Sequence, residues 1–199
     1  MVVSGQESLE AWAPEWRAEV LAAAPMIAPV RQFTYPMQVA GEEDALTRGA
    51  LAVMVHPAVG GQFLATCALG FTGQAMPSGV FACPNAEEIC LLAGGYAYLV
   101  NTRRPEECVH LGLRPVVEVK AVAVAEAGLL VFVGFHAMTA WGRDGLAWET
   151  KRLSWEGVRV GEIVGDSLRG FGWDMRTDRD VEFVVDLRTG EHVGGGFHG

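Results

Sequence analysis

The sequence predicts an all-β fold, predominantly an antiparallel meander, with one N-terminal helix. From about Gly49 onward, short runs rich in Val, Leu and aromatic residues are separated by Gly, Pro, Asn or Asp. Turn signals recur at hairpin distances, among them GRDG at 142–145 and GD at 165–166. Residues 8–24 instead carry apolar side chains at helical spacing. We therefore expect a helix and connector over residues 1–48, packed on an antiparallel β domain over residues 49–199.

The expected helix covers residues 8–24. Ser8 is available as its N-cap, and Pro14 fits a first helical turn if the helix starts near Ala13. The apolar residues at helical spacing are Leu9, Trp12, Trp16, Val20 and Leu21. Residues 25–36 contain three prolines, which disfavour a helix and indicate an extended connector.

The β region divides into short strands with turn residues between them. Residues 50–56 and 62–71 flank PAVGG and predict a hairpin. The next strands are expected at 79–83, 89–95, 96–102 and 116–127. The last third predicts a sequential meander at 129–141, 146–154, 158–164, 167–173 and 181–187, closed by a short strand after Gly190.

Three turns repeat a pattern in which a strand end is followed by an arginine and then by Gly or Pro. They are LVNTRRP, TAWGRDG and VVDLRTG, and their arginines, Arg103, Arg143 and Arg188, are 40 and 45 positions apart. A spacing of about 40–45 residues is that of a four-stranded propeller blade. Glycine-aromatic pairs at Gly70, Gly95, Gly134 and Gly170 form a second, less regular repeat.

The segments MTAWGRDGLAWE and FVVDLRTGEHVGG resemble blade hairpins of the quinoprotein and WD-repeat β-propellers. The resemblance covers residues 89–195 and implies blades in which an Asp- or Gly-containing turn joins the inner strands, with a following Trp or Val packed between blades. A closed propeller needs at least about four blades of some 40 residues each. An open stack of blades and a sandwich of twisted sheets therefore remain alternatives. No catalytic or quinone-binding residue is carried over, and we expect no cofactor.

Composition excludes several classes of function. The formal net charge of −9 repels phosphate and anionic lipid, so neither nucleic acid nor a membrane is an expected partner. The first residues do not resemble a secretory signal, and the longest apolar run, 128–141, is interrupted by His136 and too short to span a membrane. A cytoplasmic protein is expected, with its four cysteines reduced and packed. The 50% hydrophobic content indicates burial on both faces of the sheets or a subunit interface, so a homo-oligomer is possible.

No motif predicts catalysis or a metal site. The chain lacks a GxSxG elbow, a phosphate-binding glycine loop and a Cys-x-x-Cys or matched His pair. The acidic segment 41–49 is expected to be a solvated turn, and Arg143-Asp144 a hairpin turn.

The leading hypothesis is a non-catalytic module that binds another protein through exposed aromatic residues near its loops. The candidate binding residues are Tyr96, His136, Trp141, Trp148 and Asp174. One alternative is a small-ligand-binding protein or enzyme, with a pocket at a sheet end lined by His136, Tyr96 and Asp174. The other is a structural oligomerisation domain.

Overall fold

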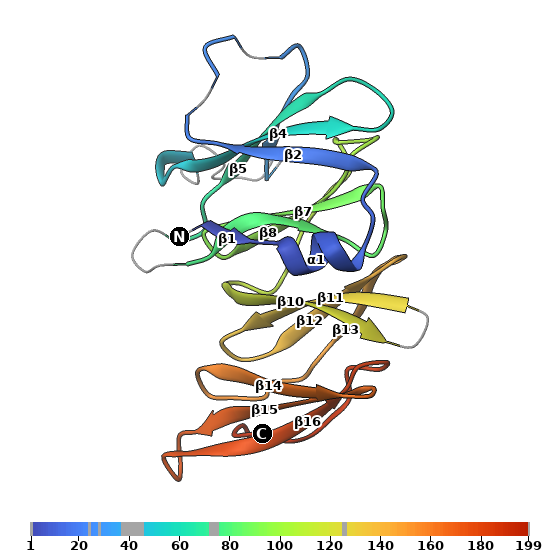
Figure 1. Ribbon diagram of the computed structural model, residues 1–199. Helices are drawn as coiled ribbons and strands as arrows, with labels where there is room; N and C mark the ends of the chain where they lie inside the picture. The colour runs from blue at the N-terminus through green and yellow to red at the C-terminus, as the bar shows by residue number, and fades with distance from the viewer. Residues whose placement is uncertain are drawn as a thin grey trace. The chain divides into compact units, whose positions relative to one another are not determined.

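The computed structural model describes residues 2–23, 25–27, 29–36, 46–71, 76–124 and 127–198, and it confirms the all-β fold (Figure 1). The chain divides into two compact units, Met1–Pro115 and Val116–Gly199. None of the helical segments in the described residues is long and apolar enough to span a bilayer. Most of the acidic segment, residues 41–45, lies outside the described residues.

The first unit contains two sheets. One has four strands in the order β2 (Trp16–Leu21), β4 (Ala50–Pro57), β5 (Phe63–Ala68) and β3 (Gln32–Tyr35). The other has five strands in the order β1 (Val2–Ser4), β6 (Ser78–Ala82), β7 (Glu88–Ala93), β8 (Tyr96–Asn101) and β9 (Cys108–His110). Neighbouring strands are antiparallel except for β1 with β6 and β3 with β5, which are parallel.

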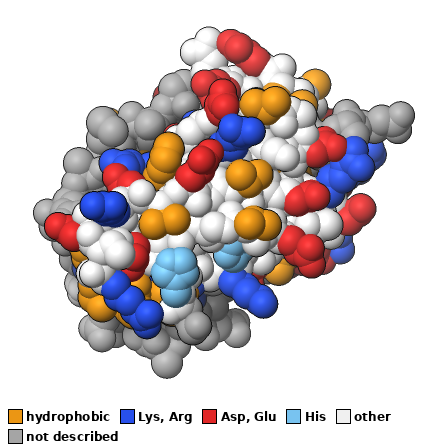
Figure 2. Space-filling view, turned by 90° about the horizontal axis from the view of Figure 1, so that it is seen from below, with side chains coloured by type: hydrophobic (Ala, Val, Ile, Leu, Met, Phe, Trp, Pro, Cys, Tyr) orange, Lys and Arg blue, Asp and Glu red, His pale blue; other side chains and the backbone are white. Residues whose placement is uncertain are grey.

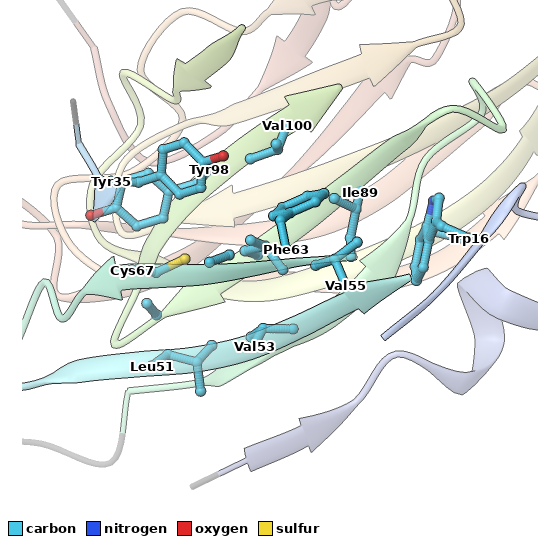
Figure 3. Close-up of a cluster of buried hydrophobic side chains, with 14 residues drawn as sticks. Trp16, Tyr35, Leu51, Val53, Val55, Phe63, Cys67, Ile89, Tyr98 and Val100 are labelled. Carbon is cyan, nitrogen blue, oxygen red and sulfur yellow. The ribbon is translucent and has the colours of Figure 1, made fainter. Parts of the chain in front are cut away.

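The core of the first unit is formed by side chains from both of its sheets (Figure 3). The rings of Phe33 and Phe63 meet edge to face at 5.5 Å between centroids. Two buried polar groups have partners, since Tyr35 Oη donates to the Pro105 carbonyl at 2.6 Å and Tyr98 Oη donates to the Ala68 carbonyl at 2.9 Å. The aromatic core is therefore tied to the backbone as well as packed.

The prediction of one helix over residues 8–24 is wrong in its extent. Helix α1 covers Gln6–Ala11, and Trp16–Leu21 forms strand β2, which pairs along its length with β4. Pro14 has no amide proton for a helical hydrogen bond, and Trp16, Ala18 and Val20 alternate onto one face as a strand requires. Ser8 does not cap the helix: its hydroxyl donates to the Gly5 carbonyl and accepts from the Ala82 amide.

The second unit contains two four-stranded antiparallel sheets, each a sequential meander. Their strands are β10 (Val116–Val124), β11 (Ala127–Gly134), β12 (Met138–Gly142) and β13 (Gly145–Glu149), then β14 (Val158–Val164), β15 (Ser167–Asp174), β16 (Arg179–Asp186) and β17 (His192–Gly194). The single strand expected at 129–141 is two strands, with a turn at residues 135–137. The short strand expected after Gly190 is present as β17.

The connector between the two sheets of this unit, residues 150–157, packs tightly against β15. A Cβ atom at Gly172 would overlap the Leu153 carbonyl oxygen, and one at Gly170 would overlap the Phe183 ring. Both glycines lie on the inner face of β15 with Leu168. Their lack of a side chain lets the connector and the ring approach the sheet closely.

Candidate functional site

The three repeated arginine turns occupy one topological position. Arg103, Arg143 and Arg188 lie in the turns that join the last two strands of three successive sheets, namely β8–β9, β12–β13 and β16–β17. Arg103 pairs with Glu87 in the β6–β7 turn, and Arg188 pairs with Asp166 in the β14–β15 turn. In both sheets, the arginine therefore links two turns at the same end of the sheet, which is a structural role.

Trp141 and Trp148 lie on the strands that flank the GRDG turn, and both are buried, at 6% exposure. Trp148 belongs to the core of the second unit, where its indole Nε1 donates to the Leu187 carbonyl at 2.7 Å. The same ring packs against Gly190 in the β16–β17 turn. Neither tryptophan offers an exposed ring to a partner.

His136 is exposed in the turn between β11 and β12, so the expectation that it lies within a strand is wrong. Its Nδ1 lies 3.4 Å from Arg152 Nη2. Arg152 also donates to the carbonyl oxygens of Ser154 and Trp155, at 3.0 and 2.9 Å. Its guanidinium carbon lies 5.0 Å from the Trp155 ring centroid and 4.6 Å from that of Phe197. These contacts fasten the C-terminal segment to the connector.

Asp174 is buried at the end of β15, where its carboxylate accepts hydrogen bonds from Thr177 Oγ1 at 2.7 Å and from the Arg176 amide at 2.9 Å. These bonds, that from Thr177 first, hold the pKa of the carboxyl below its usual range. The Asp174 carboxylate thus stabilises the β15–β16 turn that follows it. No hydrogen bond joins it to His136 among the described residues.

Tyr96 belongs to the first unit, in an aromatic cluster with His110. The His110 ring centroid lies 4.8 Å from that of Tyr96 and 4.7 Å from that of Tyr98, and Arg114 lies over the Tyr96 ring. Burial, together with the Arg114 charge, lowers the pKa of His110 to about 4. His110 is therefore neutral at physiological pH and packs as an aromatic ring. Tyr96, His136 and Asp174 are divided between two units and form no common constellation within either one.

The four cysteines are free thiols, and all of them belong to the first unit. Burial raises the pKa of Cys67, Cys83 and Cys90 far above its usual range, and that of Cys108 to about 12. A thiol that stays protonated is a poor nucleophile and a poor metal ligand. Within the described parts of the chain, no group of three or more His, Cys, Asp or Glu residues is placed to hold a metal ion.

One hollow in the second unit combines acidic and basic side chains. Its volume is about 350 Å³, and it is lined by Glu149, Lys151, Thr189, Gly190, Glu191 and His192. These residues come from the end of β13, the following connector, the β16–β17 turn and the start of β17. Burial and the nearby Lys151 charge lower the pKa of His192, which favours its neutral form.

The sheet β14–β15–β16–β17 has one buried and one open face. Burial alternates along β15, so that Leu168, Gly170 and Gly172 face the core while Arg169, Phe171 and Trp173 face outward. Phe171 is 43% exposed and Val193 is 79% exposed. Figure 2, seen from below Figure 1, shows single hydrophobic side chains interspersed with acidic and basic ones.

Charged residues surround the apolar side chains of this open face. Arg159 pairs with Asp180, and Arg169 lies 3.9 Å from a Glu162 carboxylate oxygen and 4.0 Å from a Glu182 one. The strand register places Phe171 opposite Glu182, and Val184 between Arg169 and Val193. We call this surface, formed by Phe171, Val184, Val193 and the charged residues around them, the outer face of the last sheet.

The candidate binding residues chosen from the sequence did not include Phe171, Val193, Arg152 or the residues of the hollow, although Phe171 belongs to one of the repeated glycine-aromatic pairs. The alternation in SLRGFGWD carried a usable signal for Phe171, because it places small and apolar residues on one face and Phe171 on the other. The hollow had no comparable signal in the sequence, since it joins Glu149 and Lys151 to a turn some 40 residues later.

No known family model matches the chain. No curated protein is similar enough to count as a relative.

Proposed function

We propose that this chain is a non-catalytic module that binds another protein through the outer face of the last sheet. The observation that carries the proposal is the exposure of Phe171 and Val193, at 43% and 79%, on β15 and β17, the two strands that flank β16 in this sheet. The backbone of hydrogen-bonded strands is already ordered, so little backbone conformational entropy is lost when a partner covers them. Exposed aromatic residues with a charged rim, such as Phe171 between Arg159 and Glu182, are common anchors of protein interfaces.

The loop between β2 and β3 offers a second group of exposed apolar side chains. Met26, Ile27 and Val30 are each at least 90% exposed there. A loop without sheet pairing must be ordered when it binds, which costs free energy that a sheet face does not lose. This difference favours the sheet face as the binding surface.

The partner that fits best has an apolar contact surface with a basic rim. The net charge of −9 attracts a basic protein and raises its rate of association. It disfavours nucleic acid and anionic membranes as partners, and we place the interaction in the cytoplasm.

The repeated turns support a blade-like origin for three of the sheets. In each, the arginine turn joins the last two strands of a four-stranded antiparallel meander, and four-stranded antiparallel sheets are compatible with an arrangement of blades. Blade-like sheets commonly act as scaffolds for binding surfaces, which agrees with a role in recognition.

The experiment places a photo-reactive benzoylphenylalanine at position 171 and, as the control, at position 146. Leu146 lies on β13 and is 55% exposed, so it is somewhat more open than Phe171 but belongs to another sheet. In cells of the source organism, position 171 should cross-link to one defined protein that position 146 does not reach. That protein, once purified, should bind the unmodified chain directly.

Equal cross-linking from both positions would contradict the proposal. So would cross-linking of position 171 to a second copy of this chain, because the face would then be a homo-oligomer interface. A size measurement of the purified chain separates these outcomes, since binding to a different protein predicts a monomer in isolation.

A further inference from the structure

We propose a second binding site, for a small zwitterion with one ammonium and one carboxylate group, such as a free α-amino acid. The site is the hollow lined by Glu149, Lys151, Thr189, Gly190, Glu191 and His192. It lies in the second unit and is independent of protein binding by the outer face of the last sheet. Three features support it: the size of the hollow, its fixed turn and the charged side chains that line it without forming ion pairs.

The volume of the hollow, about 350 Å³, falls at the lower end of the range for small-molecule sites. Its walls come from two sheets of the same unit, since Glu149 belongs to β13 and His192 to β17. A ligand in it would touch the edge strands of both sheets. This position suits a molecule of amino-acid size.

The turn that forms one wall is held by hydrogen bonds. The Gly190 amide donates to the Asp186 carbonyl at 2.8 Å, and the Asp186 amide donates to the Glu191 carbonyl at 2.8 Å. The Glu191 amide donates to Thr189 Oγ1 at 3.2 Å. Trp148 connects this turn to the opposite strand through its bond to the Leu187 carbonyl. The wall is therefore fixed before any ligand arrives, which lowers the entropic cost of binding.

The charged side chains of the hollow form no ion pair with one another. Elsewhere in this unit, Arg159, Arg169 and Arg188 each pair with an acidic residue. Across the described residues, by contrast, no ion pair includes Glu149, Lys151 or Glu191, although all of them line one hollow. Opposite charges that share a cavity without touching leave room for a ligand that contacts both.

The polar groups match the two ends of a zwitterion. Lys151 supplies a positive charge for a carboxylate, and neutral His192 and the Thr189 hydroxyl can donate hydrogen bonds to it. Glu149 and Glu191 supply carboxylates for an ammonium group. A purely anionic ligand would meet two carboxylates, and a purely cationic one would meet Lys151. A molecule with both charges satisfies all of these groups.

The test is isothermal titration calorimetry of the full chain with each of the standard L-amino acids at millimolar concentrations. At least one should give saturable heat. Its N-acetyl derivative lacks the ammonium and its amide lacks the carboxylate, so each should bind at least about tenfold more weakly. Absence of saturable heat with every amino acid would overturn the proposal, as would equal binding of either derivative.

Two variants locate the site. Lys151→Met and Glu191→Gln should each weaken the binding about tenfold or more, because each removes one charge that the ligand contacts. The matched controls are Arg143→Met and Glu156→Gln, which remove exposed charges outside the hollow. Thermal unfolding of all four variants verifies that they fold. Unchanged binding in folded Lys151→Met and Glu191→Gln would overturn the assignment to this hollow.

Discussion

Trp148 holds the two sheets of the second unit together, and its replacement tests that role. Trp148→Ala removes a ring that is 94% buried, so the free energy of unfolding should fall by about 3–5 kcal/mol. Trp148→Phe keeps most of the apolar contact but leaves the Leu187 carbonyl without its indole donor. That smaller change should cost about 1–3 kcal/mol. Urea unfolding, monitored by far-ultraviolet circular dichroism, measures the free energy of unfolding of both variants.

Leu146→Ala is the control for Trp148, because Leu146 lies on the same strand but is 55% exposed. It should change stability by less than about 0.5 kcal/mol. Because all four cysteines lie in the first unit, thiol labelling during the same titrations reports on that unit alone. A decrease of less than about 1 kcal/mol in the free energy of unfolding of Trp148→Ala would refute the reasoning, because removal of a core tryptophan destabilises a protein by more than that.

Three further predictions concern the interior. His110 has a pKa of about 4 in the folded chain and about 6.5 when unfolded, so stability of the first unit should decrease as the pH falls from about 6.5 to 4. The full pKa shift corresponds to a loss of about 3 kcal/mol in the free energy of unfolding, and solvent screening at this half-buried site reduces the loss to about 1–2 kcal/mol. Urea unfolding of the first unit, followed with an acid-tolerant thiol reagent, measures this loss. Gly172→Ala should lower thermal stability by about 1–3 kcal/mol, because its methyl group would overlap the Leu153 carbonyl. Cys67, Cys83 and Cys90 should not react with a thiol reagent at pH 8 until the first unit unfolds, because they are buried and protonated.

The first two of these predictions have a control variant, and all three have a contrary outcome. His110→Gln should remove the pH dependence and His136→Gln should keep it, so an unchanged profile in His110→Gln contradicts the assignment. Gly112→Ala should be neutral because nothing lies within 4 Å of its added methyl group, and an equal loss at both glycines would contradict the packing argument. Rapid labelling of the native chain at more than one thiol would contradict the burial of these cysteines.

Turn chemistry made most of the β region predictable. Gly165-Asp166 and GRDG fix hairpins through local backbone preferences, and β14 lies at 158–164 as predicted. The N-terminal helix was overextended because Trp16 and Val20 are four apart, a spacing that fits both a helical face and one face of a strand. Pairing with β4, a long-range interaction, decides between them.

The candidate site was less predictable, because sequence identifies residue types better than the direction in which side chains point. Trp141 and Trp148 are large and flank a polar turn, yet both are buried. Asp174 bonds within its own turn, and His136 contacts Arg152 rather than an acid. The partners of Asp174 are local, two and three residues along the chain, whereas the contact of His136 comes from the packing of the connector, which no local pattern encodes.

The central claim is that the outer face of the last sheet binds a partner protein, and Phe171→Arg tests it most directly. The affinity of the purified chain for its cross-linked partner should fall at least about thirtyfold, which corresponds to the roughly 2 kcal/mol of an interface hot spot. Leu146→Arg, on β13, should leave the affinity unchanged. An unchanged affinity in folded Phe171→Arg would contradict the account.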